Sequence, residues 1–496
     1  MSNFALLKGN LILPMTEPSL KYKTILSLFW SFIDKFGQQI LNFLSMLILM
    51  NIVATEDYGK IGSLAIFVAF SSILIDSGFG RVLLNRQNLT EKDYSTVFIF
   101  NFIFSLFLYC ILYVSAPFLG KIFHSTDITL IAKIVFISII LNGLGLIQQT
   151  ILTKKADFRG LSKINISALL IANIIAVIMA LKDYGVWALV AQTLVYSLLR
   201  TILLWIYSKW RPTFIFSTNS LKSFFSFSSK LLLTNTIATI GNNIYPSLIA
   251  LFYPMSQVAY FNQAKKYQEI PFLTISNTFR SVAMLILSEI NSESDRMKRV
   301  VSKMMKSIAF ISFPTGFIMI ILAEPLFFLF FKEKWLSAVP YFQALTLAGM
   351  LSPFLYIFNE LFIAKERSSY FLGVELLKAI LLIVLIVILL PKGLMPLAAS
   401  WVLYILATLL ISVILSSKLV SYNLLNFLRD TVPYLTIALI CSTISYLVTK
   451  NITQPIINII INILIILSLY ITTCKLFKLE MIKEIEEWYT KQKTNR

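Results

Sequence analysis

The sequence has few residues of the kinds that build metal centres and most enzyme active sites. It contains 3 cysteines and 1 histidine among 496 residues. The cysteines Cys110, Cys441 and Cys474 lie in apolar stretches without a CxxC pair, so neither a zinc site nor a disulfide framework is expected. The histidine, His124, falls in a short loop and is expected to be solvated. We therefore predict no metal ligands, no catalytic residues and no cofactor.

Charged residues are also scarce, at 14% of the chain, whereas hydrophobic residues make up 57%. In soluble proteins about a quarter of the residues are charged. In lipid, by contrast, a bundle of apolar helices is stable because each helix closes its own backbone hydrogen bonds. The composition predicts an all-α integral membrane protein. Residues 1–24 lack a compact apolar core before an Ala-x-Ala-like site, so a cleaved signal peptide is not expected.

Apolar runs of about twenty residues, bounded by charged or turn residues, predict about 14 transmembrane helices. These runs cover 25–52, 61–80, 94–117, 127–151, 164–181, 185–208, 224–252, 257–279, 307–331, 338–364, 368–390, 394–416, 431–449 and 455–474. Of the 43 Lys and Arg residues, 29 fall in the inner segments and 7 in the outer segments if the N-terminus is cytoplasmic. The positive-inside rule therefore places both termini in the cytoplasm. This bias also accounts for the net charge of +19, so nucleic-acid binding is not expected.

Similar segments recur about two hundred residues apart. "YGVWALVAQTLVY" (184–196) matches "KGLMPLAASWVLY" (392–404), and "APFLGKIF" (116–123) matches "EPLFFLFF" (324–331). We predict two six-helix bundles related as parallel repeats plus two C-terminal helices, and such repeats are typical of transporters. The expected parts are a cytoplasmic N-terminal segment (1–24), an N-terminal bundle (25–208), a cytoplasmic linker (209–223), a C-terminal bundle (224–416), two additional helices (417–474) and a cytoplasmic tail (475–496). Trp335, near an outer end, is placed as an interfacial anchor would be.

Three predicted spans carry polar residues at helical spacing, which places these residues on one face of each helix. They are Lys35, Gln38, Gln39 and Asn42 in the first span, Lys230, Asn235 and Asn242 in the seventh, and Asn262, Lys265, Lys266 and Glu269 in the eighth. A charge facing lipid at mid-depth costs roughly 2.5–3.5 kcal/mol. We therefore expect these helices to meet between the two halves and to line a cavity for a polar head group.

A second interpretation of the same charges stays open. Lys265 or Lys266 with Glu269, and Glu375 with Lys378, have the spacing of ion pairs within one helix. Such pairs let a charge reside inside a helical bundle without contacting any ligand.

Several segments in order resemble a known family. They include "LSLFWSFIDKFGQQILNFLSMLILMNIVATEDYG" (26–59), "LTKKADFRGLSKINISALL" (152–170) and "LAEPLFFLFFKEKWLSAVPYFQALTLAG" (322–349). They are similar to the Wzx/WzxC-type oligosaccharide flippases of the MATE-like exporter superfamily, over about residues 21–404. Family members often have an Arg where this chain has Asn51, so a role of that Arg does not transfer.

The resemblance implies a transporter of the cytoplasmic, or inner, membrane. Its substrate would be a polyprenyl-diphosphate-linked oligosaccharide that moves to the outer leaflet by alternating access, for O-antigen, capsule or exopolysaccharide synthesis. Its partners would be this substrate and membrane lipids, with a polysaccharide polymerase or ligase as a candidate protein partner. The sequence leaves the sugar, the coupling ion and the oligomeric state open.

Two other functions compete with this one. A cation-coupled multidrug exporter would need acidic residues in its helices, yet seven basic residues fall inside the spans: Lys35, Lys133, Arg200, Lys230, Lys265, Lys266 and Lys378. A basic lining favours an anionic diphosphate. A membrane enzyme is not expected, because the chain has no nucleophile elbow, metal motif or phosphate-binding loop and no outer segment longer than about ten residues.

Overall fold

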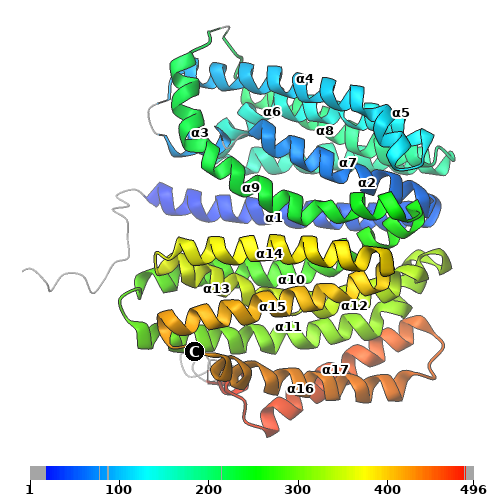
Figure 1. Cartoon of the computed structure of the whole chain (residues 1–496), viewed down its shortest axis with the longest axis vertical. Coiled ribbons are helices and arrows are strands. Elements are labelled where there is room, and N and C mark those ends of the chain that lie inside the picture. Colours follow the sequence, from blue (N-terminus) through cyan, green and yellow to red (C-terminus); the bar gives the residue numbers. More distant parts are fainter. Residues whose placement is uncertain (1–17, 77–78, 87–88, 214, 485, 488–496) are drawn as a thin grey trace, which may run out of the picture. The chain divides into compact units, whose positions relative to one another are not determined.

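The chain is built from helices in the computed structural model, which describes residues 18–76, 79–86, 89–213, 215–484 and 486–487. In chain order the helices (Figure 1) are α1 (Pro18–Ile52), α2 (Thr55–Asp76), α3 (Phe79–Asn85), α4 (Glu91–Ile122), α5 (Thr126–Val135), α6 (Ile137–Lys154), α7 (Phe158–Leu181), α8 (Val186–Ser208), α9 (Thr218–Phe252), α10 (Met255–Glu289), α11 (Ser294–Phe331), η1 (Glu333–Ala338), α12 (Val339–Gly349), α13 (Ser352–Ala364), α14 (Ser368–Leu389), η2 (Leu390–Lys392), α15 (Leu394–Val420), α16 (Leu424–Thr449) and α17 (Pro455–Leu476). Every regular element in these ranges is helical, which confirms the all-α class.

Twelve helical segments within the described residues are long and apolar enough to cross a membrane, so the chain is a multi-pass membrane protein. Each of the predicted spans overlaps a helix, although the runs 127–151 and 338–364 are each divided between two shorter helices. Helices α1 and α9, of 35 residues each, are not among the twelve. The number fourteen therefore stays a prediction.

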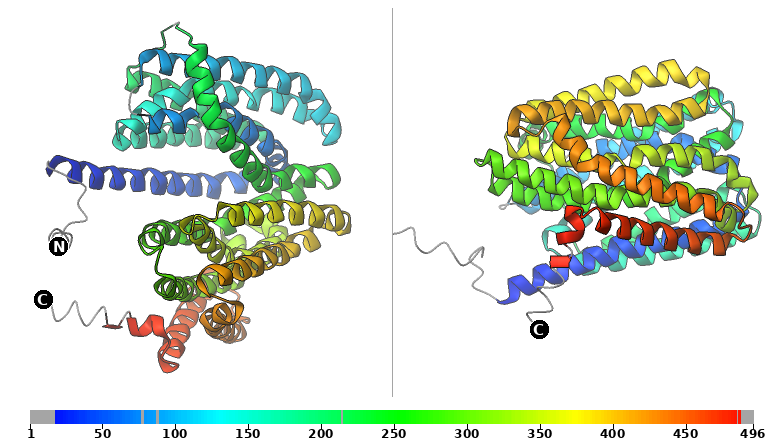
Figure 2. Two further views of the ribbon diagram at one scale, coloured as in Figure 1. Left: turned by 60° about the vertical axis from the view of Figure 1, so that its left-hand side comes forward. Right: turned by 90° about the horizontal axis from the view of Figure 1, so that it is seen from below.

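The helices pack into two units. Unit 1 comprises Met1–Val53 and Leu64–Ile240, and unit 2 comprises Ala54–Ser63 and Gly241–Arg496. In unit 1, α7 packs against α1 and α8, while α6 packs against α4 and α8. In unit 2, α10 packs against α12 and α13, and α11 packs against α16 and α17. Within each unit most of the long helices run alongside one another (Figure 2). The parallel repeat and the domain boundaries drawn from the sequence stay predictions.

Polar residues just before two helices determine where those helices begin. Asp157 Oδ1 accepts a hydrogen bond of 2.8 Å from the N–H of Gly160 at the start of α7. Asn423 Oδ1 accepts one of 3.0 Å from the N–H of Asn426 at the start of α16. The first N–H groups of a helix have no partner within the helix, so these side chains satisfy them.

Trp335 is fully buried in unit 2 rather than exposed at an interface. Its ring makes edge contacts with Tyr58 of α2 and Tyr260 of α10, at centroid distances of 5.4 and 5.8 Å. The expectation that Trp335 anchors the membrane surface is therefore wrong, because the first turns of α2 and α10 cover it.

Gly59 allows the closest approach between α2 and α10 in unit 2. A Cβ atom at this position would lie 1.8 Å from the backbone oxygen of Met255, which no side-chain rotation could relieve. The glycine is therefore required by packing and not by backbone conformation.

We predict that Gly59→Ala lowers the free energy of unfolding by about 1–3 kcal/mol, the usual cost of overpacking. Gly373→Ala on α14 is the matched control, because a Cβ there meets nothing within 4 Å. It should raise stability by up to about 1 kcal/mol through helix propensity. Thermal denaturation in detergent, followed by circular dichroism, measures both. Equal changes in the free energy of unfolding of the two variants would contradict the close approach of α2 and α10 at Gly59.

Candidate functional site

Unit 2 contains an open cavity of about 300 Å³ with both polar and apolar walls. Side chains of α10, α12, α13, α14 and α15 form its wall, and α10 contributes most of the charged and amide groups. The polar and aromatic lining residues are Lys265, Gln268, Glu269, Ser352, Tyr356, Asn359, Lys378, Trp401 and Tyr404. Two of the predicted site residues, Lys265 and Glu269, therefore lie in the same cavity.

Lys265 is a buried cation, with 7% of its surface exposed. Its Nζ atom lies 3.7 Å from Glu269 Oε1, one turn later on α10, and 4.9 Å from the centroid of the Trp401 ring. A buried ammonium is costly unless it is paired, and the carboxylate and the ring face both compensate it. The Glu269 side chain remains 41% exposed, so its carboxylate can also reach a molecule in the cavity.

A second ion pair lies on α14. Lys378 Nζ is 2.8 Å from Glu375 Oε1, and Lys378 lines the cavity. Both ion pairs that the helical spacing suggested are therefore present. The two lysines and two glutamates sum to zero charge, so the cavity is polar without being strongly cationic.

Two amide oxygens in the cavity wall are buried without a hydrogen-bond donor among the described residues. They are Gln268 Oε1 and Asn359 Oδ1. An unsatisfied buried acceptor costs roughly 1–3 kcal/mol. Both oxygens are themselves buried, so this cost falls inside the packed wall and not on the surface that a bound molecule would touch. The sequence analysis missed both residues, although Gln268 stands three positions after Lys265 on the same helix.

The other predicted residues of α10 do not line this cavity. Lys266 is exposed, and its Nζ lies 6.0 Å from the centroid of the Tyr267 ring. Asn262 faces α2, where a Cβ on Gly62 would lie 2.9 Å from Asn262 Nδ2. The polar stripe of α10 is thus divided between the cavity and other surroundings.

The polar stripe of α1 in unit 1 is divided in the same way. Lys35, Gln39 and Asn42 are exposed. Gln38 is half-buried, and its Nε2 donates a hydrogen bond of 2.9 Å to Asp34 Oδ1. Gln38 therefore belongs to the packed side of α1, which the predicted single polar face did not anticipate.

Asp34 enters a hydrogen-bonded network within unit 1. Its carboxylate accepts from Asn165 Nδ2 of α7 at 3.2 Å, and Asn165 Oδ1 accepts from Arg200 Nε of α8 at 2.9 Å. Arg200 also donates to Gln149 Oε1 of α6 at 2.7 Å. Four helices are joined through this network, so the charged side chains of Asp34 and Arg200 both have partners.

Three predicted residues, Lys230, Asn235 and Asn242, lie on α9. Their backbone is helical, and their side chains are not among those that the structure describes.

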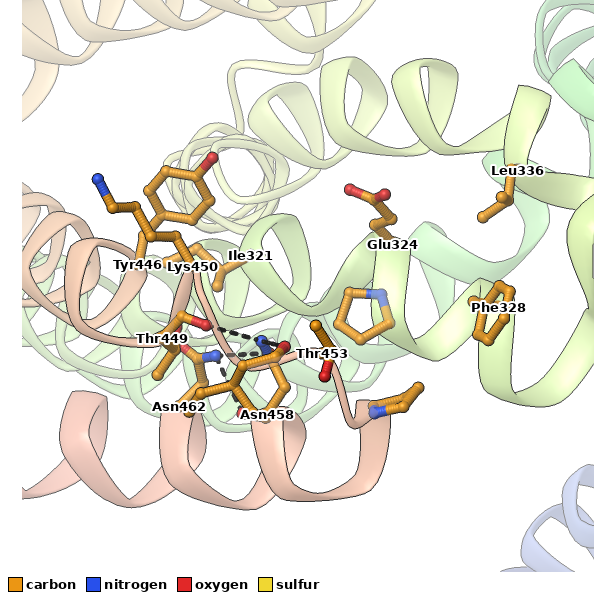
Figure 3. Close-up of a pocket in the computed structure, with 13 residues that line it drawn as sticks. Ile321, Glu324, Phe328, Leu336, Tyr446, Thr449, Lys450, Thr453, Asn458 and Asn462 are labelled. Atoms are coloured by element: carbon orange, nitrogen blue, oxygen red, sulfur yellow. Dashed lines mark hydrogen bonds between the residues drawn. The ribbon is translucent and has the colours of Figure 1, made fainter.

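A second cavity of unit 2, of about 370 Å³, lies where α11 meets α16 and α17 (Figure 3). Asn462, which is fully buried, accepts hydrogen bonds from Ser445 Oγ at 2.6 Å and Thr449 Oγ1 at 3.1 Å. Its Nδ2 donates to Asn458 Oδ1 at 2.8 Å. These amides and hydroxyls satisfy one another across α16 and α17, as expected of polar groups between membrane helices.

A search for clusters of three or more His, Cys, Asp or Glu side chains able to hold a metal ion found none within the described ranges.

We predict that Glu269→Gln lowers the free energy of unfolding by about 1–2 kcal/mol, because it leaves the Lys265 ammonium buried without its carboxylate. Removing one partner of a fully buried pair costs about 3–5 kcal/mol, and the exposure of Glu269 reduces this. Adding Lys265→Met should recover most of the loss. Glu289→Gln, at an exposed position of the same helix, is the control. If the free energies of unfolding lost through the two substitutions simply added up in the double variant, the two side chains would not be coupled.

Comparison with known proteins places the chain in a family. The profile of the polysaccharide biosynthesis protein family matches residues 48–340, more than half of the chain. The teichuronic acid biosynthesis protein TuaB of Bacillus subtilis is 27% identical over 355 residues, which are 71% of this chain and 73% of TuaB.

Two solved transporter structures share the fold. The lipid II flippase MurJ, in an inward closed conformation, superposes with a TM-score of 0.74 at 18% identity, covering 90% of this chain and 99% of MurJ. An inward-facing multidrug resistance MATE family transporter superposes with a TM-score of 0.60 at 12% identity, covering 80% and 94% of the two chains. These matches confirm the resemblance drawn from the sequence, and the chain belongs to the polysaccharide biosynthesis protein family.

Proposed function

We propose that this protein is a flippase that moves a polyprenyl-diphosphate-linked oligosaccharide to the outer leaflet during surface polysaccharide synthesis. Family membership over more than half of the chain is the observation that carries this proposal. The fold shared with the lipid II flippase MurJ supports it. The proposed substrate class includes O-antigen, capsule and exopolysaccharide units.

Exposed cations on two helices support an anionic substrate. Lys35 of α1 and Lys266 of α10 are exposed, and neither has a carboxylate partner in the described part of the chain. An anion that enters a membrane protein needs compensating positive charge. An inside-negative potential would also favour outward transfer, by about 2.3 kcal/mol for each charge that crosses 100 mV. We assign both lysines to attraction of the diphosphate.

The cavity of unit 2 supports contacts with the saccharide. The carboxylate of Glu269, whose side chain is 41% exposed, matches the hydroxyl donors of a saccharide. Trp401 offers an apolar ring in the same wall. This combination of acceptors and an aromatic ring suits sugar hydroxyls better than an apolar drug.

A cation-coupled multidrug exporter is the second candidate, and the fold shared with a MATE transporter favours it. Such an exporter needs carboxylates that are available to protons or metal cations. In this chain Glu375 is paired with Lys378, and Arg280 Nε lies 2.6 Å from Glu360 Oε1. These pairs support the flippase.

We further propose that the protein resides in the cytoplasmic membrane with both termini in the cytoplasm. The excess of Lys and Arg in the predicted inner segments supports this orientation. A polysaccharide polymerase or ligase would receive the transferred unit on the outer side.

Single-cysteine labelling in a cysteine-free variant tests the orientation. Cysteines should react from outside at positions 121, 182 and 392, and only after permeabilisation at positions 155, 298 and 483. The reverse pattern at two or more positions would reject the proposed topology.

We predict that Lys35→Gln and Lys266→Gln each slow transfer of a lipid-linked oligosaccharide in reconstituted vesicles by about tenfold or more. A charge-assisted contact with phosphate contributes roughly 1.5–3 kcal/mol, and Gln keeps the reach of Lys without its charge. Lysine-to-arginine variants should retain more activity, because they keep the charge. Lys163→Gln, at an exposed position of α7, is the control. Parental rates in both Gln variants and in their combination would reject the assignment of these lysines.

A further inference from the structure

A third cavity of unit 2, of about 390 Å³, lies where α11 and α16 begin and where the chain turns after α17. Its α11 wall consists of Lys298, Ser302 and Lys306, which share one face of the helix because they are four residues apart. Arg429 and Asp430 of α16 and Lys478 and Glu480 of the turn after α17 complete its charged lining.

The buried carboxylate of this cavity is fully occupied. Asp430 is 5% exposed, and its Oδ2 accepts hydrogen bonds from Ser302 Oγ at 2.6 Å and Tyr422 Oη at 2.9 Å. Lys306 Nζ lies 3.5 Å from Asp430 Oδ1 and 2.5 Å from Glu480 Oε2. Lys306 thus lies between the two carboxylates and compensates one of their negative charges, so most of the positive charge of the other cations stays uncompensated.

Three cations of the lining have no such partner. Lys298, Arg429 and Lys478 make no ion pair or hydrogen bond through their side chains with any described residue. The lining carries four basic and two acidic side chains, so its net charge is +2. Positive charge without a partner attracts anions, and phosphate is an anion that Lys and Arg side chains bind well.

Apolar residues next to these cations indicate where the anion comes from. Leu428 precedes Arg429 and is 42% exposed, while Phe477 precedes Lys478 and is 70% exposed. Leu425, one turn before Arg429 on α16, is 74% exposed. Exposed apolar side chains of this kind face lipid in a membrane protein, so the cations stand where the apolar surface ends. A molecule with a phosphate and acyl chains would contact both.

We propose that this cavity binds the phosphate headgroup of an anionic phospholipid. Lys298, Arg429 and Lys478 contact the phosphate, and the apolar surface beside them contacts the acyl chains. Basic pockets between membrane helices recognise anionic lipids in this way. The inference concerns a bound lipid and does not depend on what the protein transports.

A triple variant that removes the three free cations tests the site: Lys298→Gln, Arg429→Gln and Lys478→Gln. Binding of phosphatidylglycerol and of phosphatidylcholine to the detergent-purified protein is titrated by native mass spectrometry. Each cation near a lipid surface contributes about fivefold in affinity, so the triple variant should lose on the order of a hundredfold for phosphatidylglycerol. Its affinity for phosphatidylcholine should not change.

A second triple variant controls for net charge. It removes three exposed basic residues that do not line the cavity: Arg299→Gln, Lys418→Gln and Lys483→Gln. It should bind phosphatidylglycerol within about threefold of the parent. Arg299 is the closest match, because it directly follows Lys298 on α11.

Several outcomes would overturn the proposal. Equal losses of affinity for phosphatidylglycerol in the two triple variants would show a general charge effect without a site. Equal affinity of the parent protein for phosphatidylglycerol and phosphatidylcholine would show the same. Stabilisation by inorganic phosphate or pyrophosphate, lost in the first triple variant while phosphatidylglycerol binding persists, would assign the cavity to a soluble phosphate. If the first triple variant is not monodisperse, each single variant should still show a loss of about fivefold.

Discussion

A charged group inside a membrane protein needs a partner, and this constraint explains most of the polar contacts in both units. Lipid offers neither hydrogen bonds nor counter-ions, so each buried charge must be compensated by the protein. In unit 1, Asp34 and Arg200 are joined through the amide of Asn165. In unit 2, Lys265 has both Glu269 and the face of Trp401. These contacts tie neighbouring helices or turns together and determine which side chains remain available to a substrate.

The groups available to a substrate are those that contacts within the protein do not fully occupy. On α10, consecutive lysines have different surroundings, because Lys265 is paired and buried while Lys266 is exposed. In the cavity, the Glu269 side chain is 41% exposed although Lys265 lies beside it. A substrate with an anionic diphosphate and many hydroxyl groups would satisfy both kinds of group. The proposed flippase function and the observed pairing thus follow from one electrostatic requirement.

The sequence predicted the helices well because apolar length is a local property. It could not predict every break, since the division between α5 and α6 falls near Phe136 without a proline or glycine beside it. The division between α12 and α13 did carry a signal, in Gly349 and Pro353. Packing was less predictable. Helical spacing grouped Gln38 with Lys35, although Gln38 is half-buried beside Asp34, whose carboxylate accepts from Asn165 of α7, and Lys35 is exposed. Trp335 was misjudged for the same reason, because its burial depends on α2 and α10, which are distant in sequence.

The central claim, that the protein transfers an anionic lipid-linked oligosaccharide, is tested most directly in vesicles that contain only the purified protein. Leaflet transfer of a polyprenyl-diphosphate oligosaccharide and efflux of a lipophilic cationic drug would be measured in the same preparation. The account predicts transfer of the oligosaccharide lipid well above protein-free vesicles, without drug efflux under a proton or sodium gradient. Gradient-driven drug efflux with no transfer of the oligosaccharide lipid would contradict the account and favour the multidrug exporter.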